Sequence, residues 1–192
     1  MITKTVLILL GIIAGAVGIS SASQITLDPS SLPSRQGWDY SVANLHAGTV
    51  ETDIFSTDGS LLNMNSMDQP IHWLTGGGAV LYRQSNVVSS AMPTTLECTS
   101  RMLDYEPVPS PGENHGFVAG FPDGSLEYRA AISLSQIALF DGSGFKYIAL
   151  DATEYHTYRI ETVSGSSANN FYIDDIQQAS ASARFVSGAN YL

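Results

Sequence analysis

Short apolar runs separated by clusters of Gly, Pro, Asn, Asp and Ser follow one another along most of this chain. No long window has the apolar period of an amphipathic helix, whereas several runs alternate apolar and polar residues as half-buried strands do. In residues 125–134, for example, Tyr128 alternates with Glu127 and Arg129. The pattern predicts an all-β fold, an antiparallel two-sheet β-sandwich of the jelly-roll kind, with an up-and-down barrel as the alternative.

Residues 1–23 are typical of a secretory signal peptide, which is removed from the mature protein. Lys4 is the sole charge in this segment, and an unbroken run of apolar residues and Gly covers residues 6–19. That run is shorter than the about 20 residues that a spanning helix needs. We predict cleavage at the end of this segment, one domain over residues 24–192, and a secreted, cell-surface or periplasmic location without stable membrane insertion after cleavage. An uncleaved membrane anchor is the alternative.

Charge and cysteine content exclude some partners and some chemistry. Lys and Arg number 8 and Asp and Glu number 18, for a net charge of −10. A basic footprint for nucleic acid is therefore excluded, and an anionic membrane surface is a poor partner. Cys98 is the only cysteine, so no disulfide can form within the chain. Because residues 96–100 have the composition of a strand, we expect Cys98 to be a buried apolar residue and not a nucleophile.

Three segments, in this order and spacing, resemble the concanavalin A-like lectin and glucanase domains in their laminin-G-like form from secreted bacterial proteins. They are Gln-Gly-Trp-Asp-Tyr at 36–40, the segment ending in His-Thr-Tyr-Arg-Ile-Glu at 151–161, and Phe-Tyr-Ile-Asp at 171–174. The strand-like residues 79–84 are similar to an early strand of that family. The resemblance implies two curved antiparallel sheets, a concave face that often binds glycans, and a Trp38 that packs in the core.

The chain departs from the family pattern at two places. Asp175 stands where a Gly is usual in the hairpin, so the turn is expected to differ. The family's closing strand has no clear counterpart, and either residues 183–186 or residues 189–192 would take its place.

The sequence predicts no catalytic residues. Glu51 and Asp53 would share one face of a strand, since residues two apart do so, but glucanases of this fold carry a further Glu at the position of Ser56. Lyases on related jelly rolls carry a catalytic His at the position of Ala138. A glycoside hydrolase or polysaccharide lyase on the same fold is the alternative function, and a structural surface or matrix component is another.

No cofactor is expected. The histidines are too far apart in sequence to suggest a zinc pair. The resemblance leaves a structural calcium ion open, because laminin-G-like domains often bind one with loop carboxylates. The turns contain several aspartates whose presence turn formation alone explains, so calcium ligands are not assigned from the sequence: Asp141, Asp151, Asp174 and Asp175.

The residues that we expect to bind a ligand are polar residues of strand faces turned away from the core, together with one aromatic platform. Arginines and a carboxylate of this kind hydrogen-bond sugar hydroxyls or carboxylates; a solvated face with cross-strand ion pairs is the alternative. The expected function is non-catalytic recognition of an extracellular polysaccharide or other glycan. The candidate residues are Arg83, Glu127, Arg129, Gln136 and Trp73.

Overall fold

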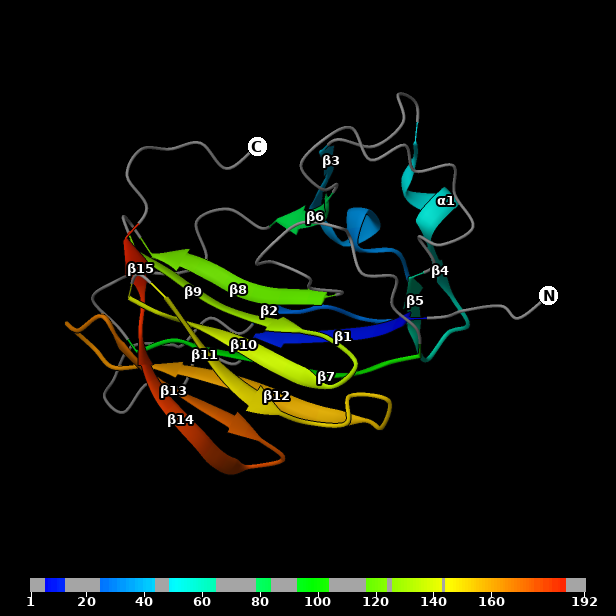
Figure 1. Cartoon of the computed structure of the whole chain (residues 1–192). Helices are drawn as coiled ribbons and strands as arrows, with labels where there is room; N and C mark the ends of the chain where they lie inside the picture. Colours follow the sequence, from blue (N-terminus) through cyan, green and yellow to red (C-terminus); the bar gives the residue numbers. More distant parts are fainter. Residues whose placement is uncertain are drawn as a thin grey trace.

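The structure is a computed structural model, and it describes residues 6–12, 25–43, 49–64, 79–83, 93–103, 117–123, 126–142 and 144–185. Over these residues the chain is mostly antiparallel β-strands with almost no helix, as Figure 1 shows. The prediction of a β-rich antiparallel fold is therefore confirmed.

The larger of the sheets has eight strands, and all its neighbouring strands pair antiparallel. Its order is β14-β13-β12-β7-β1-β5-β4, with β2 paired to β1. The strands are β1 (Val6–Ile12), β2 (Ile25–Thr26), β4 (Phe55–Thr57), β5 (Leu62–Met64), β7 (Thr95–Met102), β12 (His156–Thr162), β13 (Ala168–Ile173) and β14 (Ile176–Ser182).

The second sheet has five strands in the order β11-β10-β9-β15, with β8 also paired to β9. These strands are β8 (Phe117–Asp123), β9 (Leu126–Ile132), β10 (Gln136–Asp141), β11 (Gly144–Ala149) and β15 (Arg184–Phe185). A separate two-stranded sheet joins β3 (Asp39–Ala43) to β6 (Ala79–Arg83).

The two larger sheets share one hydrophobic core. Every second residue of β7 is buried, which matches the alternation of its sequence. The hydroxyl of Tyr128 in β9 also donates a hydrogen bond of 3.1 Å to the carbonyl of Ser166, beside β13. We call this buried set the large core; among its members are Leu96, Cys98, Tyr158, Ile160, Phe171, Tyr128, Ile132, Ile137 and Leu139. The burial of Cys98 at 3% exposure confirms the prediction for that residue.

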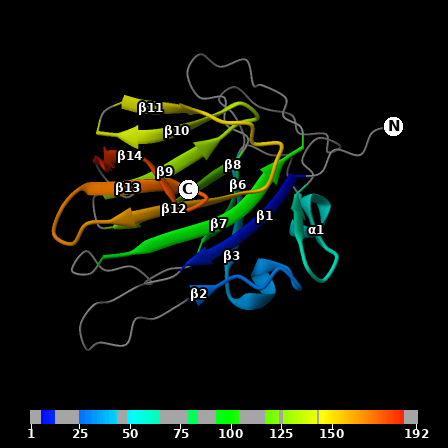
Figure 2. The same ribbon diagram turned by 90° about the horizontal axis from the view of Figure 1, so that it is seen from below.

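The edge strand β14 is linked to the hairpin of β10 and β11, so the two sheets meet along one side (Figure 2). The amide of Gly142 donates to the carbonyl of Ser182 at 2.9 Å, and the amide of Ser182 donates to Asp141 Oδ1 at 3.0 Å. Lys146 Nζ donates to the carbonyl of Ser180 at 2.6 Å. These contacts hold the hairpin turn against the neighbouring sheet.

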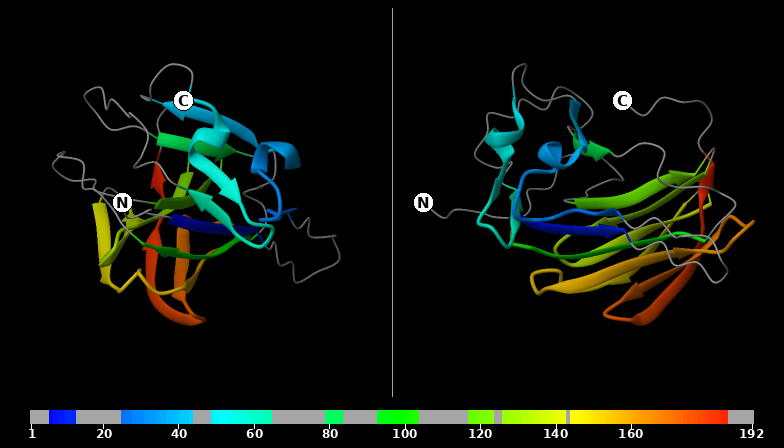
Figure 3. Two further views of the ribbon diagram at one scale, coloured as in Figure 1. Left: turned by 90° about the vertical axis from the view of Figure 1, so that its right-hand side faces the viewer. Right: turned by 180° about the vertical axis from the view of Figure 1, so that it is seen from behind.

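A smaller core lies at one end of the molecule (Figures 1 and 3), where the 3-10 helix η1 (Pro33–Gln36) and the short helix α1 (Glu51–Ile54) lie near β4. We call it the small core; its members are Leu27, Leu32, Trp38, Ile54, Phe55 and Leu62. Trp38 is 7% exposed, so the expectation that this ring packs in a core is confirmed.

The expectation that Glu51 and Asp53 share a strand face is wrong, because these residues form α1. The Asp53 carboxylate accepts the amide of Val50 at 2.8 Å, and the Asp53 amide donates to the carbonyl of Val50 at 3.0 Å. This reciprocal bonding closes the first turn of a helix and competes with an extended backbone. The strand begins only at Phe55.

Asp174 and Asp175 form the two-residue turn between β13 and β14. Both have positive φ angles, 50° and 65°, which a type I′ turn requires at its two central positions. Aspartate tolerates this backbone better than most residues, so the turn forms with Asp175 where the resembling family has Gly. Of the two candidates for a closing strand, residues 184–185 form β15, which pairs with β9 and not with β3. Residues 189–192 lie outside the described part of the chain.

Part of the predicted signal peptide is included in the larger sheet. Val6–Ile12 forms β1, between β7 and β5, with Leu9 opposite Thr99. The cleavage of residues 1–23 stays a prediction, and the cleavage point itself lies outside the described residues. Among the ranges that the structure describes, no helix is long and apolar enough to cross a membrane.

Candidate functional site

The outer face of the second sheet brings together three of the residues singled out from the sequence. Tyr128 of β9 points into the large core, so its neighbours Glu127 and Arg129 lie on the opposite face. Ala138 of β10 pairs with Ala131 of β9 and with Tyr147 of β11. Residues of alternate position along the three strands therefore share the face: Glu127, Arg129, Gln136, Phe140, Phe145 and Tyr147.

An aromatic row crosses this face. The Arg129 guanidinium carbon lies 4.0 Å from the centre of the Phe140 ring. The ring centres of Phe140 and Phe145 are 5.0 Å apart, and those of Phe145 and Tyr147 are 6.2 Å apart. We call Phe140, Phe145 and Tyr147 the aromatic row. Pairs at such separations stabilise each other, so the rings form a rigid surface.

Exposure increases along the aromatic row. Phe140 is 3% exposed, Phe145 is half-buried, and Tyr147 is 56% exposed. The exposed Gln136 lies on the same face, opposite Ala149. The face therefore offers a solvent-accessible aromatic ring and an amide to a ligand, with a half-buried cation at the other end of the aromatic row.

Glu127 and Arg129 are less accessible than the alternation suggested. Glu127 is 8% exposed, and its Oε1 lies 3.7 Å from Arg129 Nη1. Ala131 and Ala138, which share their face, are each 1% exposed. The expectation of a solvated face is wrong for this part of β9, because alternation tells which side a residue faces and not whether that side is covered. Arg129 packs on the aromatic row through Phe140, and Glu127 pairs with Arg129.

The other two predicted residues are not on this face in the described structure. Arg83 ends β6 and pairs with Asp39 of β3, in the separate two-stranded sheet. Trp73 lies outside the described residues. Conversely, the aromatic row was missed from the sequence, although a signal existed: the turn between Asp141 and Gly144 places Phe140 opposite Phe145.

Arg159, on the outer face of the larger sheet, also lies over an aromatic ring, but this cation is already paired with carboxylates. Arg159 lies over the Tyr172 ring at 4.5 Å. Its guanidinium also contacts Asp175, Glu161 at 2.9 Å and Glu97 at 3.5 Å. Three carboxylates around one guanidinium leave it few donors for a ligand.

The residues considered for catalysis have structural roles. Glu51 accepts the amide of Ser34 at 3.2 Å and also its hydroxyl. Ala138 is buried in the second sheet. Burial, and secondarily the charge of Glu97, raises the pKa of the Cys98 thiol to about 12, which keeps it protonated at neutral pH.

The turn aspartates are each occupied by the chain's own donors. Lys146 and the Ser182 amide lower the pKa of Asp141, and the Thr153 hydroxyl and amide lower that of Asp151. Arg159 contacts Asp175. Within the described residues no group of three or more His, Cys, Asp or Glu side chains could hold a metal ion. The structure assigns no calcium ligands.

Asp174 connects the hairpin turn to β12. One oxygen lies 2.6 Å from His156 Nδ1, and the other accepts the Thr157 amide at 2.9 Å. Burial raises the pKa of Asp174, but these two bonds outweigh it, so the pKa lies below its ordinary value. His156 Nε2 lies 3.1 Å from the Asp151 carbonyl, so both ring nitrogens face acceptors. The contacts stabilise the positive-φ turn.

Comparisons with known proteins return nothing for this chain: no family model, no curated protein and no solved structure matches it. The candidate site must therefore be judged from its own geometry.

Proposed function

We propose that the chain is an exported, non-catalytic recognition domain that binds an extracellular glycan on the outer face of the second sheet. In this proposal the two larger sheets form a sandwich of the concanavalin A-like, laminin-G-like class. The fold proposal is supported by antiparallel pairing throughout both sheets and by the large core that they share.

The observation that carries the binding proposal is the exposed Tyr147 ring on a rigid aromatic row. Sugar rings have apolar C–H faces and a rim of hydroxyls, so they suit a flat ring with polar groups beside it. Gln136 supplies an amide donor and acceptor on the same face. Phe145 lies against the exposed Tyr147 ring and is itself packed on Phe140, which limits the motion of the ring and lowers the entropic cost of binding.

Removal of the predicted signal peptide during export would change the larger sheet, and this change can be measured together with the cleavage. Cleavage near residue 23 would remove β1 and leave β7 without its partner on that side. The amides along that edge of β7 would then exchange faster with solvent in the cleaved chain than in the full chain. Intact-mass measurement of protein from a secreting host, followed by hydrogen exchange, tests both points; a retained leader in secreted protein contradicts the cleavage.

The binding proposal is tested on an array of polysaccharide fragments that includes laminarin, carrageenan and alginate. The fragment bound best is then titrated against Tyr147→Ala, which should weaken binding by about 10-fold or more, or ~1.4 kcal/mol, because exposed aromatic anchors dominate such faces. Tyr155→Ala is the matched control, because Tyr155 is 43% exposed and packs against Arg101 at a different surface.

Three outcomes would overturn the proposal. Equal affinity of the Tyr147→Ala protein moves the site away from the aromatic row. Release of reducing sugar by the wild-type chain from the same fragments instead favours the alternative of a glycoside hydrolase or lyase. Failure to bind any fragment favours a structural surface or matrix role.

A further inference from the structure

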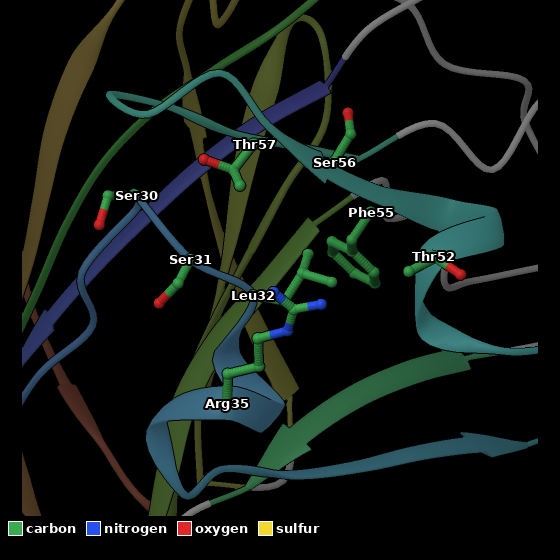
Figure 4. Close-up of a pocket in the computed structure, with 8 residues that line it drawn as sticks. All are labelled: Ser30, Ser31, Leu32, Arg35, Thr52, Phe55, Ser56 and Thr57. Atoms are coloured by element: carbon green, nitrogen blue, oxygen red, sulfur yellow. The ribbon is translucent and has the colours of Figure 1, made fainter.

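A pocket of about 370 Å³ lies beside the small core, away from the aromatic row. It lies between the loop that leads into η1 on one side and α1 with β4 on the other. Figure 4 shows the Arg35 side chain reaching over Leu32 towards the Phe55 ring. The residues that line it are Ser30, Ser31, Leu32, Arg35, Thr52, Phe55, Ser56 and Thr57.

The two walls of this pocket are joined at both ends. At one end Glu51 accepts hydrogen bonds from the amide and hydroxyl of Ser34. At the other end the Thr57 hydroxyl donates to the carbonyl of Pro29. Since the bonds join segments far apart in sequence, the pocket is formed before any ligand arrives.

The loop that forms one wall is held by Gln36. Its Oε1 accepts the Asp28 amide at 2.7 Å, and its Nε2 donates to the Asp28 carbonyl at 2.6 Å and to the Ser31 carbonyl at 2.7 Å. All three bonds go to the backbone, so they fix the loop's course. Ser30 and Ser31 are thereby presented to the pocket at defined positions.

The lining combines one cation, hydroxyls and an apolar floor. Leu32 and Phe55 are 8% and 4% exposed and belong to the small core. Five of the eight lining residues are serine or threonine, and Arg35 is the only charged one. The neighbouring carboxylates of Glu51 and Asp53 are bonded to Ser34 and Val50 and do not line the pocket.

Arg35 differs from the other basic side chains that the structure describes. Arg129 and Lys146 each contact a carboxylate, Arg159 contacts three, and Arg101 lies over the Tyr155 ring. Within the described part of the chain the Arg35 side chain has no ion pair, hydrogen bond or ring contact, and only its backbone amide is bonded, to the carbonyl of Leu32 at 3.0 Å. In a protein with 18 acidic residues, an unpaired guanidinium at a preformed pocket is available to a ligand carboxylate.

We propose that this pocket binds one uronate unit, with the sugar carboxylate on Arg35. The hydroxyls of the sugar then meet the serine and threonine side chains, and an apolar face of its ring covers Leu32 and Phe55. The volume is near the lower end of the range for ligand sites, which suits a single sugar ring. A longer polyanion is disfavoured by the protein's net charge of −10. The proposal does not depend on glycan binding at the aromatic row.

The test is titration of the purified full chain with glucuronate and, in parallel, with glucose. Saturable binding of glucuronate, much weaker binding of glucose, and a loss of affinity of ~10-fold or more in Arg35→Gln are expected, because a charge-assisted bond is removed. Arg35→Lys should give an intermediate loss, since it keeps the charge but not the two-pronged geometry. Lys146→Gln is the control of equal charge change and should bind as the wild type does.

Each opposite result overturns the proposal. These are no saturable binding of glucuronate, equal binding of glucose, or an Arg35→Gln protein with unchanged affinity. If Tyr147→Ala removes glucuronate binding and Arg35→Gln does not, the pocket proposal fails while glycan binding at the aromatic row stands. Hydrogen exchange of the Arg35→Gln protein should show an intact loop, because the substitution keeps the backbone amide that donates to Leu32 and the Arg35 side chain forms no bond that holds the loop.

Discussion

The large core and the small core are stabilised in different ways. Around the large core the strands β12, β13 and β7 are joined by continuous ladders of backbone hydrogen bonds, and their inner side chains are apolar. Around the small core, short elements are joined by individual side chains, above all Gln36 and Glu51. Met64 packs against both cores and connects them.

The difference shows which region depends on backbone ladders and which depends on single side chains. In a sheet, neighbouring strands satisfy each other's backbone groups, so the outer polar side chains can vary. In the loop before η1 the amide of Asp28 and the carbonyls of Asp28 and Ser31 depend on one Gln36 side chain. Without that side chain the Asp28 amide and the Ser31 carbonyl have no partner among the described residues, and the Asp28 carbonyl keeps only the Ser31 amide at 3.4 Å.

The largest expected effect comes from removing one buried phenylalanine ring from each core and comparing the loss of stability. Phe171 is 0% exposed in the large core, and Phe55 is 4% exposed in the small core. Phe171→Ala should lower the free energy of unfolding by ~3 to 5 kcal/mol, because it opens a cavity between the sheets. Phe55→Ala removes the same atoms from the small core. It should lower the free energy of global unfolding less, while the amides near α1 exchange faster with solvent. Urea unfolding and hydrogen exchange measure both; a larger global loss for Phe55→Ala would contradict the comparison.

The next effect tests the side-chain bonds of the small core. Gln36→Ala removes three hydrogen bonds to the backbone and should cost ~1 to 3 kcal/mol in the stability of the loop before η1. Amide exchange at Asp28 should accelerate, while the amides of β12 and β13 keep their protection. Gln177→Ala is the matched control, because Gln177 is an exposed glutamine of β14 whose side chain donates, among the described residues, to the side chains of Asn170 and Ser180 and not to the backbone. Faster exchange throughout β12 would show that the two regions unfold together.

The smallest effect concerns a polar contact at the rim of the large sheet. The pKa of Asp174 is lowered in the folded chain, so its contribution to stability is present above the ordinary carboxylate pKa of ~3.9 and is lost as the pH falls through the folded value. Asp174→Asn should lack this acid-dependent loss and be less stable near neutral pH by only ~0 to 1 kcal/mol, because the side chain is half exposed. Thermal unfolding from pH 2 to 7 measures it. A parallel pH dependence in the wild type and Asp174→Asn would contradict the assignment.

The strands were largely predictable because their signals are local. The alternation around Tyr128 corresponds to β9, and the His-Thr-Tyr-Arg-Ile-Glu residues of the segment 151–161 lie in β12. The helical turn before Phe55 was not predictable in the same way. It forms in a short polar segment and depends on the hydrogen bonds between Val50 and Asp53. In the candidate site, Glu127, Arg129 and Gln136 were expected on strand faces turned away from the core, but neither the face that Gln136 shares with the other two nor the aromatic row was predicted.

By itself the sequence determined the strand-rich class, the strand that buries Cys98, and the side to which each residue of a strand points, because these depend on neighbours in the chain; the burial of Trp38 was expected from the family resemblance alone. The tertiary structure alone decided which of those sides is covered and which distant segments meet. Glu127 is buried because other residues cover the face of β9 that carries it. The alternation of apolar and polar residues along a strand does not show whether a face is covered. Arg35 lines a pocket with Thr52 because η1 and α1 pack on one core, a contact between segments that no local pattern encodes.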